Sequence, residues 1–173
     1  MKQNVHLYGG FNGTENSLDQ RNWEDNETII DGESLRHCVV GVELGNNATL
    51  NGFNITHGYG GNGGGISMTY SSSPTISNCN FFENISGDGG GIFTGWSSSP
   101  TLENCIFTDN TAWRGGAIHT YSGSNPKIIN CIISANLVYS PSRGPTWAQG
   151  GGMFNFADCS PEVINCTFSD NSA

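Results

Sequence analysis

Hydrophobic residues in this chain fall in short runs, within which they alternate with polar residues at intervals of two. This alternation is the periodicity of β-strands, whereas an amphipathic helix repeats its apolar positions about every 3.6 residues. The runs end at Gly, Asn or Ser-Pro, which favour turns, and 101–103 followed by 106–108 is a representative pair. No segment carries the helical period. The pattern predicts an all-β protein of many short strands.

The strand pattern itself repeats along the chain. Two successive steps of the repeat are 26 residues long and the next is 35, as measured between Cys79, Cys105, Cys131 and Cys166. Each unit begins with Gly-Gly-(Gly/Ala)-(Ile/Met), at 63–66, 89–92, 115–118 and 150–153. One such unit cannot bury its own apolar side, but stacked units can. The repeat therefore predicts a solenoid.

We expect the units to stack as the coils of a single-stranded right-handed parallel β-helix (a β-solenoid), with neighbouring strands ~4.8 Å apart. Residues 1–36 are expected to form an irregular N-terminal coil with a long loop. Residues 37–173 are expected to form the repeat coils of the same domain, with one nine-residue insertion between 136 and 150. The last unit stops where the next glycine triplet would begin, so we expect the chain to be part of a longer protein.

Two asparagine columns accompany the cysteines, one directly before each Cys and one five positions after it. Asn tolerates the left-handed backbone conformation, and stacked Asn amides can bond to one another. We therefore expect both columns to lie at corners of the coil. Their members are Asn78, Asn104, Asn130 and Asn165, and then Asn84, Asn110, Asn136 and Asn171.

The four stacked cysteines are expected to be small buried hydrophobic residues. Their Cα atoms lie within reach of a disulfide, but their Cβ vectors are parallel. Thiolates in one straight row also cannot form the tetrahedron that zinc requires. The cysteine column therefore predicts a structural ladder.

Outward-facing aromatic residues are the best candidates for ligand binding. Tyr70 and Trp96 share one outward column, and Tyr121 and Phe156 share the next. Rings in a row suit the stacking of sugars or a protein partner, although they can also simply cover the corner of the coil. The inserted loop 139–147, which contains Trp147, is an alternative contact. Four isoleucines are also expected to face outward: Ile106, Ile129, Ile132 and Ile164.

Charge excludes several classes of partner. Six Lys and Arg residues against fifteen Asp and Glu residues give a net charge of −9, which argues against nucleic acid and anionic membranes. No apolar run is long enough to insert into a bilayer. Glu83 and Asp109 share an outward column and are weak candidates for Ca²⁺, whereas a solubilising acidic face is the simpler interpretation. We expect no other metal and no cofactor.

No catalytic residues stand out in the sequence. A polysaccharide lyase needs a basic residue beside a bound cation, and a glycoside hydrolase needs a pair of carboxylates at a set separation. The basic residues instead match acidic residues in the same columns, Lys127 with Glu162 and Arg114 with Asp88. We expect these pairs to be surface ion pairs, worth ~0–1 kcal/mol each.

The repeat resembles that of the polymorphic outer membrane proteins, whose hallmarks are Gly-Gly-Ala-Ile and Phe-x-x-Asn tetrapeptides. The best copy spans 107–118, and 81–84 and 168–171 are further copies of the second tetrapeptide. The resemblance implies a pectin-lyase-like β-helix, exported by a bacterium and displayed at its surface, with adhesion as its usual role.

Three functions remain open at this point. The leading hypothesis is a non-catalytic, adhesin-like surface module that binds a glycan or a protein. The second is a carbohydrate-active enzyme, or the remnant of one. The third is a structural unit that associates end to end with further copies of itself.

Overall fold

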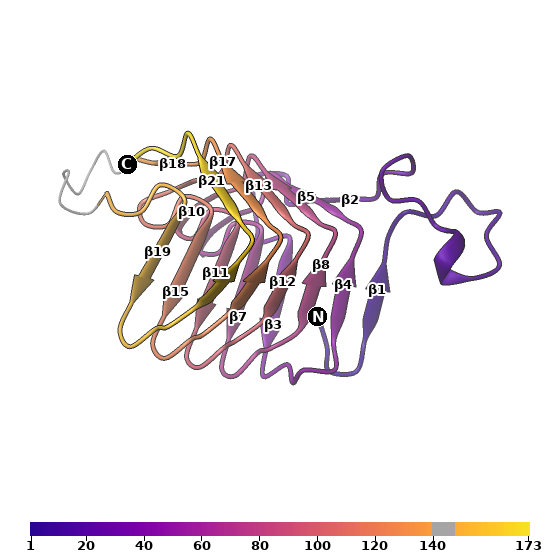
Figure 1. Ribbon diagram of the computed structural model, residues 1–173, viewed down its shortest axis with the longest axis horizontal. Helices are drawn as coiled ribbons and strands as arrows, with labels where there is room; N and C mark the ends of the chain where they lie inside the picture. Colours follow the sequence, from indigo (N-terminus) through magenta and orange to yellow (C-terminus); the bar gives the residue numbers. More distant parts are fainter. Residues whose placement is uncertain (140–147) are drawn as a thin grey trace.

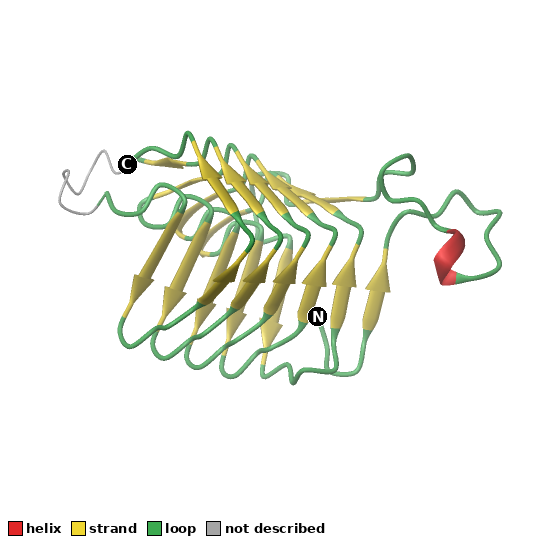
Figure 2. Ribbon diagram, viewed as in Figure 1, coloured by secondary structure: helices red, strands yellow, loops and turns green. Residues whose placement is uncertain are grey.

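A computed structural model describes residues 1–139 and 148–173 as a parallel β-solenoid of about four turns, with coils of about 26 residues. Corresponding strands of successive coils lie side by side along the long axis of the molecule (Figure 1). Almost no helix is present in the described part, where a single 3₁₀ turn, η1 (Leu18–Gln20), lies in the N-terminal loop (Figure 2). The predicted fold class is confirmed.

Four parallel sheets form the walls of the solenoid. Sheet A contains β1 (His6–Tyr8), β4 (Thr49–Asn51), β8 (Thr75–Ser77), β12 (Thr101–Glu103), β16 (Lys127–Ile129) and β20 (Glu162–Ile164). Sheet B contains β2 (Ile29–Asp31), β5 (Asn54–Thr56), β9 (Asn80–Phe82), β13 (Ile106–Thr108), β17 (Ile132–Ser134) and β21 (Thr167–Ser169). Sheet C contains β3 (Val39–Val42), β7 (Ile66–Thr69), β11 (Ile92–Gly95), β15 (Ile118–Tyr121) and β19 (Met153–Phe156). Sheet D contains β6 (Tyr59–Asn62), β10 (Ile85–Asp88), β14 (Thr111–Ala112) and β18 (Leu137–Val138).

The strand register reproduces the repeat of the sequence. Ile92 pairs with Ile118 one coil later, 26 residues on, and Ile118 pairs with Met153 across the insertion, 35 residues on. Like residues consequently stack inside the solenoid, where the rings of Phe81 and Phe107 lie 4.6 Å apart and nearly parallel. The core is a continuous set of apolar ladders shared by neighbouring coils.

The two asparagine columns behave differently. Asn78 and its equivalents adopt φ near 50° at the corner between sheets A and B, and the exposed amide of Asn104 bonds to that of Asn78. Asn84 also lies at a corner, between sheets B and D, but its side chain is fully buried. The left-handed residue at this corner is the preceding Glu83, with φ 55°. Both asparagine columns thus lie at corners, as expected from the sequence, but at the second corner the left-handed residue precedes the asparagine.

The buried column serves the backbone instead. Asn110 Nδ2 donates to the carbonyl of Phe81, at 2.9 Å, and to Asn136 Oδ1, at 3.0 Å. Its own Oδ1 accepts bonds from the backbone N–H and the side-chain amide of Asn84. Each amide thus supplies partners to polar groups that the turn leaves inside the coil, where water cannot reach them.

The cysteines are free thiols, and the stacked ones line the interior. Cys79, Cys105 and Cys131 are buried, whereas Cys166 in the last described coil is half-buried. Burial raises the pKa of the Cys79 thiol to about 11. The structure therefore places these residues as small apolar groups that pack between the isoleucine and phenylalanine ladders.

The N-terminal segment contributes to the same sheets as the repeat. β1 pairs with β4 and β2 pairs with β5, while the intervening residues 9–28 leave the coil as a loop. Residues 140–147, which include the predicted contact Trp147, lie outside the described residues. Within the described ranges, no helix has the length and apolar character needed to cross a membrane.

Candidate functional site

The outer face of sheet C carries most of the aromatic residues of the repeat. Because side chains alternate along each strand, two columns of this sheet point away from the core. Phe93, His119 and Phe154 occupy one of them in consecutive coils, and Tyr121 and Phe156 occupy the other. The sequence pattern thus places rings next to one another at the spacing of the coils.

Four of the aromatic residues predicted as ligand-binding form one continuous strip. The rings of Tyr70 and Trp96 are stacked with centroids 5.3 Å apart, and those of Tyr121 and Phe156 are stacked at 6.0 Å. The Trp96 and Tyr121 rings join the two pairs edge to face, at 5.7 Å. Tyr70, Trp96 and Phe156 are 54%, 37% and 50% exposed. We refer to these four residues as the aromatic strip.

A second layer of rings supports the aromatic strip from below. Phe93 and His119 point away from the core, yet they are only 2% and 0% exposed, because neighbouring side chains cover them. The Phe93 ring lies 6.0 Å from Trp96 and 5.5 Å from His119. Gly95 leaves room for this ring, since a Cβ there would be 2.6 Å from Phe93 Cε1. The exposed rings therefore rest on a packed layer that limits their movement.

An ion pair borders the strip where sheet C meets sheet D. Arg114 donates two hydrogen bonds to the Asp88 carboxylate, from Nε at 2.8 Å and from Nη2 at 2.7 Å. The two side chains are only 23% and 15% exposed. The expectation of a weak surface pair is therefore wrong here, since a bidentate, largely covered pair is held far more rigidly than an exposed one.

His119 connects this ion pair to the aromatic layers. Its Nδ1 lies 3.5 Å from Asp88 Oδ1, at the outer limit of a hydrogen bond, and neither ring nitrogen has a closer polar partner among the described residues. Burial raises the pKa of Asp88, but the interactions with His119 and Arg114 outweigh it and hold that pKa below the usual value. Asp88 is thus an ionised carboxylate at neutral pH.

A groove runs between the ion pair and the rings. It has a volume of about 310 Å³, which is at the lower end of the range for small-molecule sites. Its lining combines flat apolar surfaces with a carboxylate, a guanidinium and an amide. The lining residues are Asn62, Asp88, Phe93, Trp96, Arg114, Tyr121 and Phe156.

Sequence reasoning found the rings of this site but not its polar side. Asp88 and Arg114 share a column, as expected, but the sequence did not reveal that this column borders the aromatic groove. Asn62, which lies one coil before Asp88 and pairs with it, was not predicted as a site residue. The sequence did hold a signal for this polar side: each of these residues directly precedes a glycine triplet. The triplet forms the corner that leads into sheet C, so the residue before it lies at the border of that sheet.

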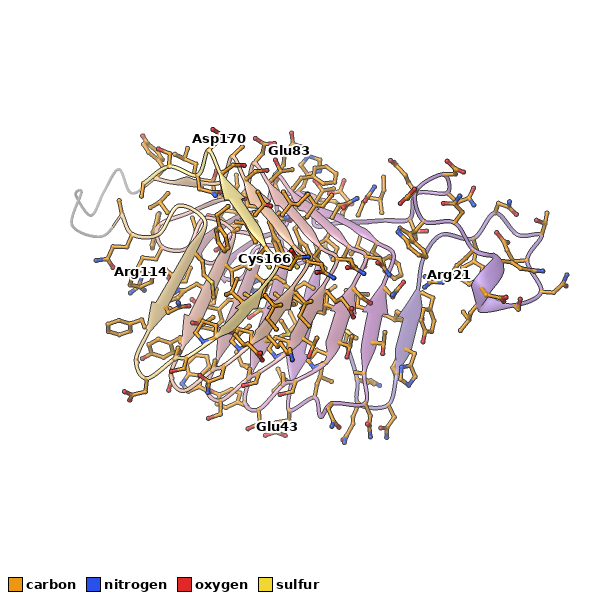
Figure 3. The ribbon with its side chains drawn as sticks, in the orientation of Figure 1. Arg21, Glu43, Glu83, Arg114, Cys166 and Asp170 are labelled. Carbon is orange, nitrogen blue, oxygen red and sulfur yellow. The ribbon has the colours of Figure 1, made fainter. Side chains whose placement is uncertain are left out.

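The acidic column predicted as a weak Ca²⁺ candidate has partners of its own. Glu83 lies 3.1 Å from His57 Nε2, and His57 Nδ1 lies 3.2 Å from Asp31. Asp109 accepts a hydrogen bond from Thr108. Figure 3 shows Glu83 and Asp170 along one edge of the solenoid. Among the described residues, no group of three or more His, Cys, Asp or Glu side chains is arranged to hold a metal ion.

Two further surface predictions concern the outer faces of sheets A and B. Lys127 and Glu162 lie 3.4 Å apart with both side chains well exposed, as a weak surface ion pair requires. Ile106, Ile132 and Ile164 are between 38% and 44% exposed, so they do face outward, and the fourth predicted isoleucine, Ile129, is half-buried. Both features lie on other walls of the coil than the aromatic strip.

Comparison with protein families agrees with the geometry of the coils. Residues 11–173 match the family described as "Right handed beta helix region". The chain belongs to this family. The solenoid is therefore a right-handed β-helix, and its sheet C carries the candidate site on its outer face. Comparisons with curated proteins and with solved structures found no significant match to this β-helix.

Proposed function

We propose that this β-helix is a non-catalytic, adhesin-like module, displayed outside a bacterial cell, which binds a glycan through the aromatic strip. The observation that carries the proposal is the strip itself. Its exposed rings are held at the spacing of the coils beside a groove with fixed polar groups. Sugar rings present apolar C–H faces that stack on aromatic side chains, and hydroxyl groups that bond to polar ones.

The charge of the groove favours a neutral glycan. Asp88 and Arg114 neutralise each other through their bidentate contact, so the described lining of the groove presents no net charge to a uronate or an amine. A carboxylate can accept about four hydrogen bonds, and Arg114 occupies two of these positions on Asp88. The remaining positions, together with the Asn62 amide, are suited to sugar hydroxyl groups.

Location outside the cell is supported by the sequence resemblance. The Phe-x-x-Asn and Gly-Gly-Ala-Ile tetrapeptides are hallmarks of surface-displayed bacterial repeats, and the best copy spans 107–118. The chain has few charged residues and is acidic overall, which suits an extracellular binding surface and disfavours binding to nucleic acid.

A carbohydrate-active enzyme is the second candidate. It is favoured by the contact between Asp88, Arg114 and the buried His119, since groups of this kind transfer protons in active sites. Against it, Asp88 is the one carboxylate that lines the groove within the described part of the chain, whereas glycoside hydrolysis uses a pair of carboxylates.

The test measures retention and turnover on the same samples. The protein is passed over xylan, mannan and laminarin, which are neutral, and over alginate and polygalacturonate, with and without Ca²⁺. We expect retention on at least one neutral polysaccharide, no new chain ends, and loss of retention in Trp96→Ala. Turnover would overturn the non-catalytic proposal, and unaltered retention of Trp96→Ala would overturn the assignment to the strip. Retention on none of them would refute glycan binding at this site. A protein partner and end-to-end association would then be the remaining hypotheses.

A further inference from the structure

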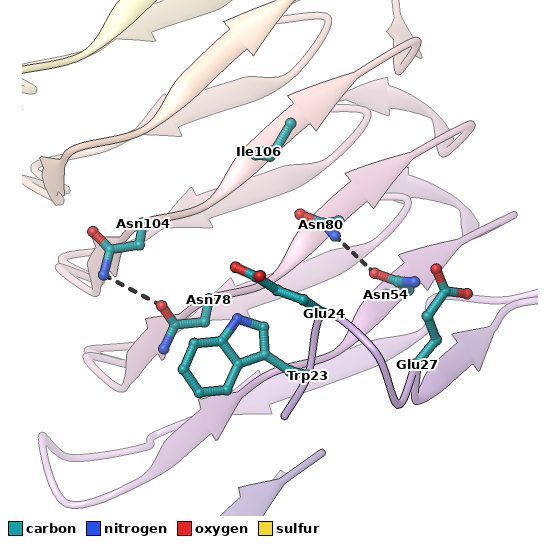
Figure 4. A pocket seen from close by; sticks show the side chains of 8 residues that line it. All are labelled: Trp23, Glu24, Glu27, Asn54, Asn78, Asn80, Asn104 and Ile106. Carbon is teal, nitrogen blue, oxygen red and sulfur yellow. Dashed lines mark hydrogen bonds between the residues drawn. The ribbon is translucent and has the colours of Figure 1, made fainter. Parts of the chain in front are cut away.

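A second groove lies on sheet B, which is separated from sheet C by sheet A on one side and by sheet D on the other. The N-terminal loop folds over the outer face of this sheet and leaves a space of about 280 Å³. Trp23, Glu24 and Glu27 from the loop form one side of the groove, and asparagines of sheet B and its corner form the other (Figure 4). Figure 4 shows the Glu24 carboxylate reaching over the sheet toward the asparagine column.

The loop side of this groove is fixed in place. The Arg21 guanidinium lies 5.0 Å from the ring centroids of both Tyr8 and Trp23, so it is held between the two rings. The same guanidinium donates to the Gly9 carbonyl, at 3.1 Å, and to the Asn51 side chain. These contacts attach the loop to β4 and hold the indole against the sheet. The groove is therefore preformed, which lowers the entropic cost of ordering its side chains when a ligand binds.

The floor of the groove offers hydrogen-bond donors. Asn80 Nδ2 donates to Asn54 Oδ1, at 2.9 Å, and Asn104 Nδ2 donates to Asn78 Oδ1, at 3.3 Å. Both ladders run toward the N-terminal coil, where Asn54 is followed by Ile29 in its column. Asn54 Nδ2 and Asn78 Nδ2 consequently have no acceptor among the described residues. Two amide groups thus end in the groove with their N–H bonds available.

The loop side offers negative charge. The Glu24 and Glu27 carboxylates are exposed and make no ion pair or hydrogen bond within the described part of the chain. Among the described residues, no Lys or Arg side chain lines the groove to neutralise them. The Trp23 indole adds a ring face, which attracts cations as well as apolar C–H groups. This composition is the opposite of the neutral Asp88–Arg114 groove on sheet C.

A ligand that satisfies all three features must carry positive charge, oxygen acceptors and a flat C–H face together. We propose that this groove binds a protonated amino sugar, a hexose unit with a free amine, as part of a glycan. The ammonium lies between the two carboxylates, the hydroxyl oxygens accept from Asn54 and Asn78, and the sugar ring stacks on Trp23. A lysine side chain supplies the charge but no flat ring face to stack on Trp23, and an N-acetylated sugar supplies no charge.

The experiment titrates the protein with a glucosamine oligomer, with the matching N-acetylglucosamine oligomer and with a lysine pentapeptide. Heat of binding gives the affinity, and the ¹⁵N indole resonance of Trp23, assigned with Trp23→Phe, reports whether the ligand reaches the groove. Glu24→Gln combined with Glu27→Gln removes the charge while preserving shape. Glu43→Gln combined with Asp170→Asn changes the net charge by the same amount at exposed positions away from this groove and is the matched control.

We expect the glucosamine oligomer to bind and to shift the Trp23 resonance. The Glu24/Glu27 variant should lose about tenfold or more in affinity, the equivalent of at least one favourable charge contact, while the control variant retains it. The N-acetylated oligomer should bind at least about tenfold more weakly. Preference for the N-acetylated oligomer, for the peptide or for neither ligand would overturn the proposal, as would equal binding by the two double variants. The Trp23 resonance reports on this groove, whereas retention on the neutral polysaccharides reports on the aromatic strip, so failure here and failure at sheet C are distinguishable.

Discussion

Replacing Asn110 by Ala tests how much the buried asparagine ladder contributes to the stability of the β-helix. The side chain is fully buried and makes four hydrogen bonds: two that it donates, to Phe81 and Asn136, and two that it accepts from Asn84. A hydrogen bond contributes a net of about 1 kcal/mol on average, so four of them amount to about 4 kcal/mol. The partners also stay buried without replacement, which adds to the loss.

The matched control is Asn104→Gly in the other asparagine column. Asn104 is exposed, its ladder bonds to Asn78 and Asn130 are 3.3 Å long, and its φ is 52°. Water can replace these bonds, and glycine accepts a positive φ without strain, so the expected loss is below about 1 kcal/mol.

Urea unfolding followed by circular dichroism measures both variants against the unchanged protein. Since domains of this kind are stable by about 5–15 kcal/mol, a loss of about 4 kcal/mol lowers the unfolding midpoint strongly or prevents folding. Equal midpoints for Asn110→Ala and Asn104→Gly would refute the reasoning, because the two columns would then be equivalent despite their different burial.

Three further predictions follow from the packing of the coils. Gly90→Ala should fail to yield folded protein, as judged by circular dichroism, because the new Cβ would lie 2.3 Å from the Gly116 carbonyl oxygen; a folded variant would contradict the coil spacing. The pKa of Asp88 is lowered in the folded state, so its contribution to stability is present above the ordinary value of 3.8 and is lost as pH falls through the lower folded value. As the pH is lowered below ~4, the unfolding midpoint of Asp88→Asn should therefore fall less than that of the unchanged protein. Parallel plots of midpoint against pH for the two proteins would argue against the pair with Arg114. The Cys79 thiol, whose pKa burial raises to about 11, should resist a thiol reagent at pH ~8 until the protein unfolds, as mass spectrometry can show; rapid native labelling would contradict its burial.

Most of the fold could be predicted because the length of the repeat determines which residues pair between neighbouring strands. Each column of like residues corresponds to one ladder, and pairs such as Ile92 and Ile118 follow from counting 26 residues. The left-handed turn at Asn78 was also predictable, since two residues three positions apart both had to face the core. The turn before Asn84 was not, because Glu83 has no particular preference for a positive φ.

The candidate site was predicted only in its exposed half. Tyr70 and Trp96 lie one repeat apart, so their stacking follows from the register. The burial of Phe93 and His119 on an outward-facing column depends on how the rings fold over Gly95, which column counting does not reveal. The second groove depends on where the loop 9–28 turns, and this segment lies outside the repeat.

The most direct test of glycan binding by the aromatic strip compares two tyrosines of equal exposure. Tyr70 is 54% exposed on the strip, and Tyr59 is 53% exposed on sheet D. Affinity electrophoresis through gels that contain xylan, mannan or laminarin measures the retardation of the unchanged protein, Tyr70→Ala and Tyr59→Ala. The account predicts that the unchanged protein and Tyr59→Ala are retarded equally by at least one of these polysaccharides, and that Tyr70→Ala migrates faster. Equal retardation of all three proteins, or retardation of none, would contradict it.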